Sequence, residues 1–532
     1  MHKRNEDYRF GSAEFAGYYD LKRAGMLRQQ ENSLFIGFLG KRPVWYSGAG
    51  GWLITGGARS GKLATILGYN ICAGIYTPTT VLLDMKGELS CISQDQTPDR
   101  KFVIHWNPAL LHGLPSKRIN PVEFIHANNP TLIADVKVFC ENFLPLSKST
   151  NSEYFDRRAQ EFLEGIILTL VVVKGQLHLN DLYRVINLIP GNTDEWIDFA
   201  WEMQQSGFPI SKRVEEEIAN SREDTTGGFS GILGVIFKGF AALSDDKLLA
   251  SVSPPYDVSL KDVVEGKRRY SLNLMPPAEF IEPWAPVIKS IVIALVIYKS
   301  RMPQAPQMTI FLDECGQLGS FPGVLKLFTF GAGTGIRPVG VFQSSKQMKA
   351  LGPDAENILT SSAQLRSTFG MRDIETANTL SSMIGAETLS YFDPAQQMRA
   401  GHQRQQAIMS MVSGGDPMQS ALNYAYHKRD AATPRQMRRQ KMSADELLQM
   451  PSDRQIIFTD ALGKPAYLER RPYYEERFMA GRYHPNPYHP PLDRVRVKTR
   501  WGYAWRKVIR EPVPSAYADY PQYADGYWSK TS

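Results

Sequence analysis

Short apolar runs separated by glycine and proline residues occupy the first part of the chain, up to about residue 147. Two of these runs, Trp52–Thr55 and Val81–Asp84, have the length and composition of buried strands, and the segment Lys62–Ala73 between them fits a helix. A strand, a helix and a second strand in this order form a parallel crossover unit. The pattern therefore predicts an α/β fold with a mostly parallel sheet.

The pattern of apolar positions becomes helical between about residues 148 and 255. Apolar side chains recur there at intervals of three and four residues, as over 155–170, and the segments Asp194–Met203 and Val214–Ser221 also fit helices. The alternation typical of strands is lost in this zone. We therefore interpret residues 148–255 as an all-α domain inserted into the α/β fold.

Strand patterns return between about residues 256 and 470, with helical stretches within 285–300 and 363–384. The predicted strands of this zone are Tyr270–Leu274, Thr309–Asp313, Pro338–Phe342 and Gln455–Asp460. A stretch rich in Gln, Met and Gly, Ala395–Pro434, interrupts the zone and is predicted to be a flexible loop. Residues 1–147 and 256–470 thus form the two parts of one α/β domain.

The last zone, residues 471–532, is rich in Tyr, Pro and Arg and lacks periodicity. This composition predicts a tail that wraps a surface or becomes ordered on binding. Its cations and aromatic residues interleave: Arg494, Arg496, Lys498, Arg500, Trp501, Tyr503, Trp505, Arg506, Lys507 and Arg510. Cations beside aromatic faces suit nucleic acid or an acidic partner. The alternative is a solvated strap whose aromatic rings pack on the main domain.

Length and composition limit the class of protein. For 532 residues, two or three domains are expected, and 43% hydrophobic with 22% charged residues excludes a disordered, collagen-like or coiled-coil chain. The net charge of +7 is compatible with a nucleic-acid partner without requiring one. The four cysteines are widely separated and contain no CxxC pair, which argues against a disulfide scaffold or a zinc site and favours a reduced cytosol.

Two further observations concern membranes. The first seven residues are polar and do not fit a signal peptide. The longest apolar runs, Gly165–Val173 and Ile291–Tyr298, have about half of the ~20 residues that a membrane span needs. We therefore expect no transmembrane segment in this chain.

A glycine-rich motif follows the first predicted strand and opens the first predicted helix. Its residues match the pattern GxxxxGK: Gly56, Gly57, Ala58, Arg59, Ser60, Gly61 and Lys62. In such a loop the backbone N–H groups turn inward around phosphates, and the lysine reaches the terminal phosphates. The sequence therefore predicts a nucleotide-binding loop that extends to Leu63. The alternative is a glycine-rich turn with an exposed lysine.

The metal that accompanies such a nucleotide needs another ligand. Leu63 stands where the usual pattern places the Ser or Thr that binds Mg²⁺, and Thr65 is a poor substitute. The strand 308–312 ends in two acids, so Asp313 is the candidate for the Mg²⁺ shell and Glu314 for polarising the attacking water. Ordinary solvated acids after a strand are the alternative.

Two more polar residues follow predicted strands. Asp84 ends the strand next after the phosphate loop, and Gln343 ends the strand 338–342. Because ligands of parallel α/β sheets bind at the carboxyl ends of the strands, Gln343 is placed to sense the γ-phosphate. The alternative is a polar residue that begins a loop. Any arginine supplied by a neighbouring subunit would come from Arg337, Arg366 or Arg372, each of which also fits a surface or salt-bridge role.

In their order along the chain, these motifs resemble the TraG-type conjugative coupling proteins of type IV secretion systems. The resemblance extends from about residue 11 to about residue 475 and leaves out only the tail. The segments that carry it are Gly11–Ala13, Arg59–Lys62, Asp84–Leu89, Asn120–Pro121, Leu312–Gly319, Gly335–Arg337, Gln343, Thr368–Asp373, Glu375–Ala377 and Arg470–Tyr474.

This resemblance implies a RecA-like P-loop domain with an inserted all-α domain that recruits substrates. It implies that ATP with Mg²⁺ is hydrolysed at the subunit interfaces of a ring, usually a hexamer. Carried over by position, Lys62 is the phosphate lysine, Asp313 and Glu314 are the acidic pair, and Gln343 is the sensor. The expected partners are type IV secretion channel components, DNA, and relaxase or effector proteins, at the cytoplasmic face of the bacterial inner membrane.

The sequence departs from the family pattern in three places. Family members normally begin with transmembrane helices, whereas this chain reaches Gly11 almost at once, so a membrane-anchored partner or a soluble variant is expected. The hydroxyl after Lys62 is missing, as in many members. An arginine that some relatives carry shortly before Gly335 is replaced by the segment Gly331–Gly333.

Three hypotheses follow. The first is an ATP-driven coupling motor for conjugative transfer. The second is a recruitment platform that binds nucleotide but hydrolyses little of it, which Leu63 and the missing membrane helices favour. The third is a DNA-pumping ATPase unrelated to secretion, to which the moderate net charge gives little support.

Overall fold

The computed structural model describes residues 8–72, 75–76, 78–94, 101–146, 150–191, 193–221 and 227–531. The polar segment 1–7, the predicted helix end at Ala73 and the predicted zone boundary at 147 lie outside these residues. The chain forms two compact units. The main unit contains residues 18–369, 452–461 and 468–532, and the small unit contains residues up to 17, 370–451 and 462–467.

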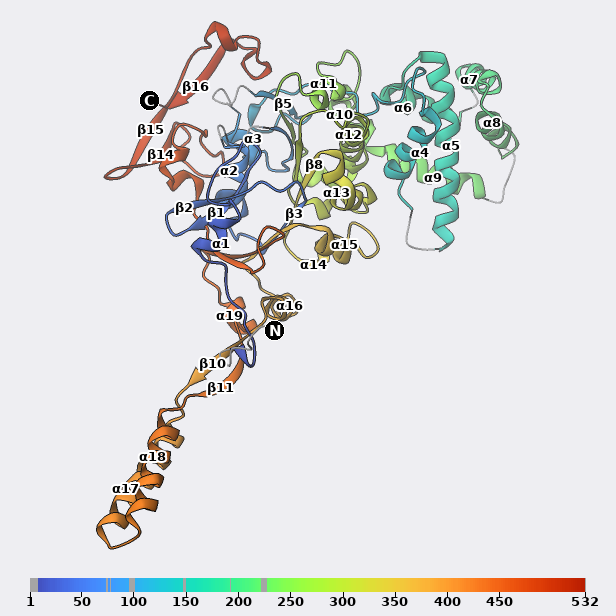
Figure 1. The fold of residues 1–532 in the computed structure, drawn as a ribbon. Helices are drawn as coiled ribbons and strands as arrows, with labels where there is room; N and C mark the ends of the chain where they lie inside the picture. Colours follow the sequence, from blue (N-terminus) through green and yellow to red (C-terminus); the bar gives the residue numbers. More distant parts are fainter. Residues whose placement is uncertain are drawn as a thin grey trace. The chain divides into compact units, whose positions relative to one another are not determined.

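An eleven-stranded sheet is the centre of the main unit (Figure 1). Seven neighbouring strands, β9 to β5 in the order below, pair in parallel, and the strands at the other edge pair antiparallel. The order is β2 (Arg42–Tyr46), β1 (Leu34–Leu39), β13 (Ala466–Glu469), β12 (Arg454–Thr459), β9 (Leu365–Phe369), β3 (Trp52–Gly56), β8 (Ile336–Phe342), β7 (Met308–Leu312), β4 (Thr79–Leu83), β6 (Tyr270–Leu274) and β5 (Phe102–Trp106). The predicted mostly parallel α/β sheet is confirmed.

The predicted strands form because each is a short run of apolar and β-branched residues that is buried on both faces, as parallel strands are. All five residues of β4 and of β7 are buried, as are all seven of β8. Helices lie before β1 and between the later strands. They are α1 (Tyr18–Arg23), the π-helical turn η2 (Leu63–Leu67), α2 (Gly68–Ile71), α3 (Glu88–Ile92), α13 (Pro322–Thr334), α14 (Ser345–Lys349) and α15 (Ala355–Ser362).

Between β5 and β6, the described residues form helices and loops and contain no strand. The helices are α4 (Leu132–Phe143), α5 (Thr150–Lys174), α6 (Leu179–Leu188), α7 (Asp194–Gln205), α8 (Pro209–Ser221), α9 (Gly228–Phe240), α10 (Asp246–Ser251) and α11 (Leu260–Glu265). The apolar residues of α5 that predict its helical periodicity, such as Phe162 and Ile166, are fully buried. These helices belong to the same compact unit as the sheet, and their assignment to a separate domain stays a prediction.

One helix among the described residues is long and apolar enough to cross a membrane, by length and composition. It spans Ala278–Arg301 and includes α12 (Ile281–Arg301); 67% of its apolar window is buried inside the protein. Within the core, Ile288, Ile291 and Leu295 of α12 are fully buried. This degree of burial is typical of a core helix.

In the small unit, a two-stranded ribbon continues into a helical hairpin (Figure 1). The ribbon pairs β10 (Ala386–Tyr391) with β11 (Arg435–Gln440), the hairpin pairs α17 (Pro394–Val412) with α18 (Pro417–Ala432), and α16 (Ile374–Ile384) packs on α19 (Ala444–Leu448).

The prediction of a flexible loop over Ala395–Pro434 is therefore wrong. The signals for two helices are present: Asp393 caps α17 and Asp416 caps α18, and each is followed by a proline at the first helical position. The Gln, Met, Ala and Arg residues between these caps are good helix formers, so a composition that resembles a loop is also a helical one.

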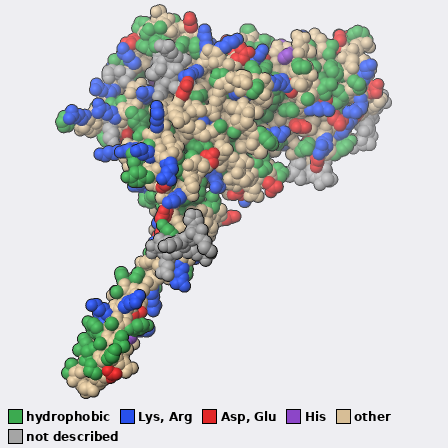
Figure 2. All heavy atoms as spheres, in the orientation of Figure 1, with side chains coloured by type: hydrophobic (Ala, Val, Ile, Leu, Met, Phe, Trp, Pro, Cys, Tyr) green, Lys and Arg blue, Asp and Glu red, His purple; other side chains and the backbone are tan. Residues whose placement is uncertain are grey.

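The tail is predicted to lack periodicity and to wrap a surface or become ordered on binding, but it has regular structure of its own. It contains a three-stranded antiparallel sheet of β14 (Arg494–Thr499), β15 (Gly502–Pro512) and β16 (Tyr527–Thr531). The missed signal is the strict alternation of cations with Val495 and Val497, whose side chains are buried. Figure 2 shows Lys and Arg side chains gathered over these strands. Trp501 is 89% exposed, so its ring is not packed, whereas the ring centre of Tyr520 lies 4.3 Å from that of Phe102 in β5.

Candidate functional site

The glycine-rich loop joins the carboxyl end of β3 to η2, as predicted. Arg59 has a φ of 57° and Gly61 a φ of 78°, so the backbone turns twice into the left-handed region. Such turns direct successive N–H groups into a concave anion-binding surface. The Lys62 ammonium lies over this loop, and its Nζ donates to the carbonyl oxygens of Gly56 at 2.7 Å and Gly57 at 3.1 Å.

The first glycine of the loop is required by packing. A Cβ at Gly56 would lie 2.7 Å from the ring of Phe369, on the neighbouring strand β9. The Ser60 hydroxyl is buried and lacks a hydrogen-bond partner in the structure. A buried hydroxyl without a partner loses hydrogen-bonding free energy, so a ligand oxygen at this loop would satisfy it. The loop residues therefore fit a phosphate-bearing ligand.

Arg470 holds the loop in place through hydrogen bonds. This arginine is only 2% exposed, and its Nη1 donates to the carbonyl oxygen of Ser60 at 2.9 Å and to the Thr65 hydroxyl at 3.0 Å. Its guanidinium carbon stacks 3.7 Å from the centre of the Phe369 ring, and burial lowers its pKa to about 10. The Thr65 hydroxyl also donates to the Gly61 carbonyl at 2.8 Å. The hydrogen bonds with Gly61 and Arg470 therefore fix the position of the Thr65 hydroxyl.

The role of Arg470 was missed, because the sequence marks this residue only as part of a family segment.

The acidic pair and the predicted sensor meet at the same edge of the sheet. Asp313 and Glu314 follow β7, and Gln343 follows the adjacent parallel strand β8. The Gln343 side-chain amide donates to Glu314 Oε1 at 2.8 Å, and the Gln317 amide donates to Glu314 Oε2 at 2.5 Å. Glu314 has a φ of 50°, a left-handed conformation that costs a non-glycine residue free energy and that recurs at functional sites.

A third carboxyl group lies on the next strand. Asp84 follows β4, is buried, and accepts hydrogen bonds from the Ser90 amide at 2.7 Å and the Ser90 hydroxyl at 2.9 Å. Burial raises the pKa of Asp84, and the Ser90 hydrogen bonds oppose this. Burial, together with the charges of Glu314 and Asp84, raises the pKa of Asp313 to about 7, while Lys62 and Lys86 lower it.

The pKa of Lys62 shifts in the opposite direction. Burial lowers its pKa, and the negative charges of Asp313 and Glu314 oppose the shift. The lysine and the two acids therefore interact electrostatically across the site. Lys62 favours the charged form of Asp313, and the two acids favour the charged form of Lys62, whereas the Glu314 charge disfavours the charged form of Asp313.

We expect Asp313→Asn to stabilise the protein above neutral pH in the absence of ligand. The pKa of Asp313 is higher in the folded protein than in the unfolded chain, so the protonated carboxyl group contributes fully to stability below about pH 4. This contribution to the free energy of unfolding is lost as the pH rises through about 7, because the buried group then becomes charged. At pH 8 the free energy of unfolding of the variant should exceed that of the wild type by about 2–4 kcal/mol. At about pH 4 the two proteins should have equal free energies of unfolding. Urea unfolding at both pH values measures the difference; an equal difference at both would contradict the assignment.

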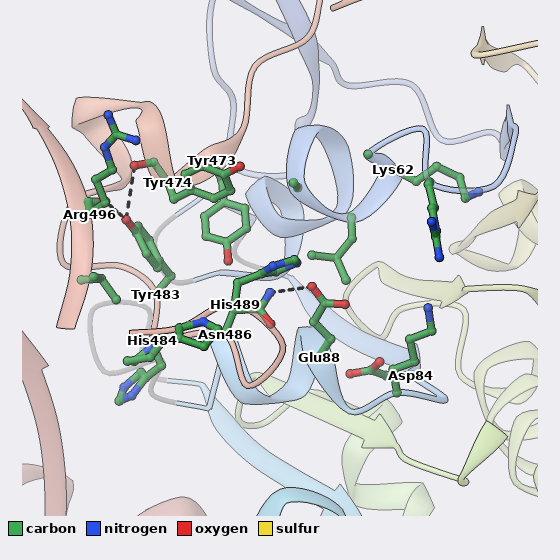
Figure 3. Close-up of a pocket in the computed structure, with 18 of the residues that line it drawn as sticks. Lys62, Asp84, Glu88, Tyr473, Tyr474, Tyr483, His484, Asn486, His489 and Arg496 are labelled. Atoms are coloured by element: carbon green, nitrogen blue, oxygen red, sulfur yellow. Dashed lines mark hydrogen bonds between the residues drawn. The ribbon is translucent and has the colours of Figure 1, made fainter. Parts of the chain in front are cut away.

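One cavity of about 850 Å³ contains these groups (Figure 3). It is lined by Ala58, Arg59, Ser60, Gly61, Lys62, Leu63, Asp84, Asp313, Glu314 and Gln343, and on another side by residues between 473 and 505. Of the predicted loop residues, Gly56 and Gly57 do not line the cavity but supply the carbonyl oxygens that hold Lys62. The predicted site residues thus converge, and the C-terminal lining was not foreseen.

The three arginines considered as donors to a neighbouring subunit lie outside this cavity, and a single chain does not test that role. Arg337 is fully buried within β8 and donates to the carbonyl oxygen of Asn32 at 2.8 Å, so it is a structural residue. Arg366 lies over the ring of Phe458, with 5.4 Å between the guanidinium carbon and the ring centre. Neither arginine lines the cavity, and Arg372 belongs to the small unit.

The donor set limits which metal could bind. The described residues contain no group of three or more His, Cys, Asp or Glu side chains that could hold an ion by themselves. Mg²⁺ is bound in nucleotide sites by one or two carboxylates together with phosphate oxygens and water. The residues around Asp313 therefore fit Mg²⁺ that arrives with a phosphate ligand.

Comparisons with known proteins agree with this geometry. The family model described as "Type IV secretory system Conjugative DNA transfer" matches residues 14–408. The conjugal transfer protein TraG of Escherichia coli is 22% identical over 520 residues, covering 89% of this chain and 77% of that protein.

Solved structures of a conjugative coupling protein share the fold. The coupling protein TrwBdeltaN70, in a trigonal form with sulphate, matches with a TM-score of 0.57 and 14% identity, covering 86% of this chain and 92% of that one. TrwB in complex with ADP and Mg²⁺ matches with a TM-score of 0.56 and 15% identity, covering 87% and 96%. The predicted RecA-like P-loop fold and the resemblance to TraG-type proteins are both confirmed. The chain belongs to the type IV secretory system conjugative DNA transfer family, the TraG-type coupling proteins.

Proposed function

We propose that this protein is an ATP-driven coupling motor that binds ATP with Mg²⁺ and hydrolyses it to feed substrates into a type IV secretion channel. The observation that carries the proposal is the meeting of Lys62, Asp313, Glu314 and Gln343 in one cavity, at the carboxyl ends of β3, β7 and β8. Solved structures of TrwB contain ADP with Mg²⁺ and a non-hydrolysable ATP analogue, which supports the same ligands here.

Each residue has a defined part in the proposed reaction. The loop Gly56–Leu63 and the Lys62 ammonium would bind the phosphates, and Asp313 would hold the Mg²⁺ shell. When bound, Mg²⁺ neutralises charge that develops on the phosphate oxygens. Glu314 accepts a proton from the attacking water, and the Gln343 amide fixes the orientation of the Glu314 carboxylate.

The proposed partners follow from the family. Its description names conjugative DNA transfer, which supports DNA, a relaxase or effector substrate, and channel components as partners. We further propose that the chain works as a hexamer at the cytoplasmic face of the inner membrane with a membrane-anchored partner, and that the helices within 148–255 recruit the substrate. The family match supports a role in secretion over a DNA pump outside it.

A recruitment platform is the second candidate, and one observation favours it. Leu63 supplies no hydroxyl for a metal, and the Thr65 hydroxyl is bound to Gly61 and Arg470. Such a site could bind nucleotide without rapid hydrolysis.

Transfer in cells separates the two candidates. In donor cells, the wild-type gene is replaced by a gene that encodes Lys62→Ala, Glu314→Gln or, as a control at an exposed position, Glu282→Gln. If the chain is a motor, we expect both site variants to lose at least about 100-fold in transfer frequency, because each removes a group needed for hydrolysis. Transfer by Glu314→Gln at the level of the control would favour the platform, and normal transfer by Lys62→Ala would exclude both nucleotide-dependent functions.

A further inference from the structure

The cavity has a second wall that the motifs of the nucleotide-binding fold do not supply. We call it the C-terminal wall and define it by the lining residues Tyr474, His484, Asn486, His489, Arg496 and Trp505. All of them lie beyond residue 408, where the match to the family model ends. The family model therefore does not cover the wall.

Hydrogen bonds attach the wall to the segment that follows β4. The Asn486 amide donates to Glu88 Oε1 at 2.5 Å, the Tyr488 hydroxyl donates to the Lys86 carbonyl at 3.1 Å, and the His484 amide nitrogen donates to the Ile92 carbonyl at 2.9 Å. These acceptors all lie in the segment that follows β4 and Asp84. The wall is thus attached to the sheet edge that carries the acidic residues.

The two ends of the cavity differ in chemistry. In Figure 3, Lys62 and Asp84 lie on one side of Glu88, while Asn486, His489 and the tyrosines lie on the other. The carboxylates that line the cavity all come from the sheet side, and the described residues of the wall contribute aromatic, amide and cationic groups. Tyr474 is 36% exposed, Trp505 is 52% exposed and His489 is exposed, so all three side chains are accessible to a ligand in the cavity.

Open aromatic rings and an amide are the groups that bind a nucleobase. Aromatic side chains stack on any base, and an amide or imidazole can hydrogen-bond to its edge. A volume of about 850 Å³ is in the range of pockets that enclose a whole small-molecule ligand. The phosphates and the nucleoside therefore have separate places in one cavity.

We propose that the C-terminal wall is the nucleoside-binding half of the site, where the base of the nucleotide lies against His489 and Trp505. This inference rests on the proposed function, because it places the phosphates of the same ligand at Lys62. The wall then contributes affinity for the nucleoside, and the loop contributes affinity for the phosphates. Because stacking tolerates any base, the wall should accept purine nucleotides of either kind.

The test compares a non-hydrolysable ATP analogue with inorganic tripolyphosphate, both with Mg²⁺, by calorimetric titration of the full chain. The variants are His489→Ala and Trp505→Ala. Trp501→Ala is the matched control, because Trp501 lies in the turn between β14 and β15, is more exposed than Trp505 and does not line the cavity. We expect each wall variant to lose about fivefold to tenfold in affinity for the analogue, with tripolyphosphate binding and the control unchanged.

Several outcomes would overturn the inference. Equal losses for the analogue and tripolyphosphate would show a structural effect on the loop, and unchanged affinity for both would exclude the wall from the site. Weakened binding of single-stranded DNA with unchanged analogue binding would identify the wall as a nucleic-acid surface. Lys62→Ala distinguishes failure of the wall proposal from failure of the proposed function. If Lys62→Ala weakens the binding of both ligands while the wall variants weaken the binding of neither, only the wall proposal fails. If Lys62→Ala weakens the binding of neither ligand, the proposed function fails as well.

Discussion

Glu314→Gln is expected to lower the maximal rate of ATP hydrolysis by about 10²- to 10⁴-fold, the range for loss of a general base. The change keeps the size of the side chain but removes the carboxylate that accepts the proton of the attacking water. The Gln343 amide donates to Glu314 Oε1, and a glutamine oxygen at that position can accept the same hydrogen bond. We therefore expect ATP affinity to change by less than about threefold.

Steady-state hydrolysis and equilibrium binding of ATP measure the two effects separately. Gln317→Ala is the matched control, because it removes the hydrogen-bond donor to Glu314 Oε2 and keeps the carboxylate. The control should retain most of the turnover. A Glu314→Gln rate close to that of the control would show that Glu314 is not the base.

Arg470→Ala is expected to destabilise the main unit by about 3 kcal/mol and to abolish measurable ATP binding. The substitution removes the donor to the Ser60 carbonyl and the Thr65 hydroxyl, and it removes the cation that stacks on Phe369. Buried acceptors left without donors cost about 1–3 kcal/mol each. The loop then loses the support that holds its backbone in the anion-binding conformation.

Urea unfolding followed by tryptophan fluorescence, with ATP binding measured in parallel, tests this expectation. Arg471→Ala is the control, since this neighbouring arginine is partly exposed and contacts Glu469 and the Gly40 carbonyl instead of the loop. Arg470→Lys should not restore binding, because an ammonium cannot reproduce the planar set of guanidinium donors. Equal stability and binding for Arg470→Ala and Arg471→Ala would contradict the supporting role.

The sheet and the centre of the site could be predicted because their signals are local. A short buried strand followed at once by a polar residue places that residue at the carboxyl edge of a parallel sheet, and this rule brought Asp84, Asp313 and Gln343 together. The spacing of glycines and lysine in the loop is likewise contained in seven consecutive residues, from Gly56 to Lys62. Each of these features could be predicted from a few consecutive residues.

The rest of the site depends on contacts between distant segments. Asn486 and Glu88 are 398 residues apart, and Arg470 and Ser60 are 410 residues apart. Composition does not reveal such pairs, because the same Tyr-, Pro- and Arg-rich segment is compatible with a free strap. The hairpin of α17 and α18 was missed for a different reason: its capping aspartates are local signals, and the Gln- and Met-rich composition outweighed them.

The central claim is that this cavity hydrolyses ATP through Lys62. Its most direct test is ATP hydrolysis by the purified full chain, wild type beside Lys62→Ala, with and without single-stranded DNA. We expect Mg²⁺-dependent turnover that rises with DNA and falls by at least about 100-fold in the variant. Equal rates for the two proteins, or bound ATP without turnover in the wild type, would contradict it.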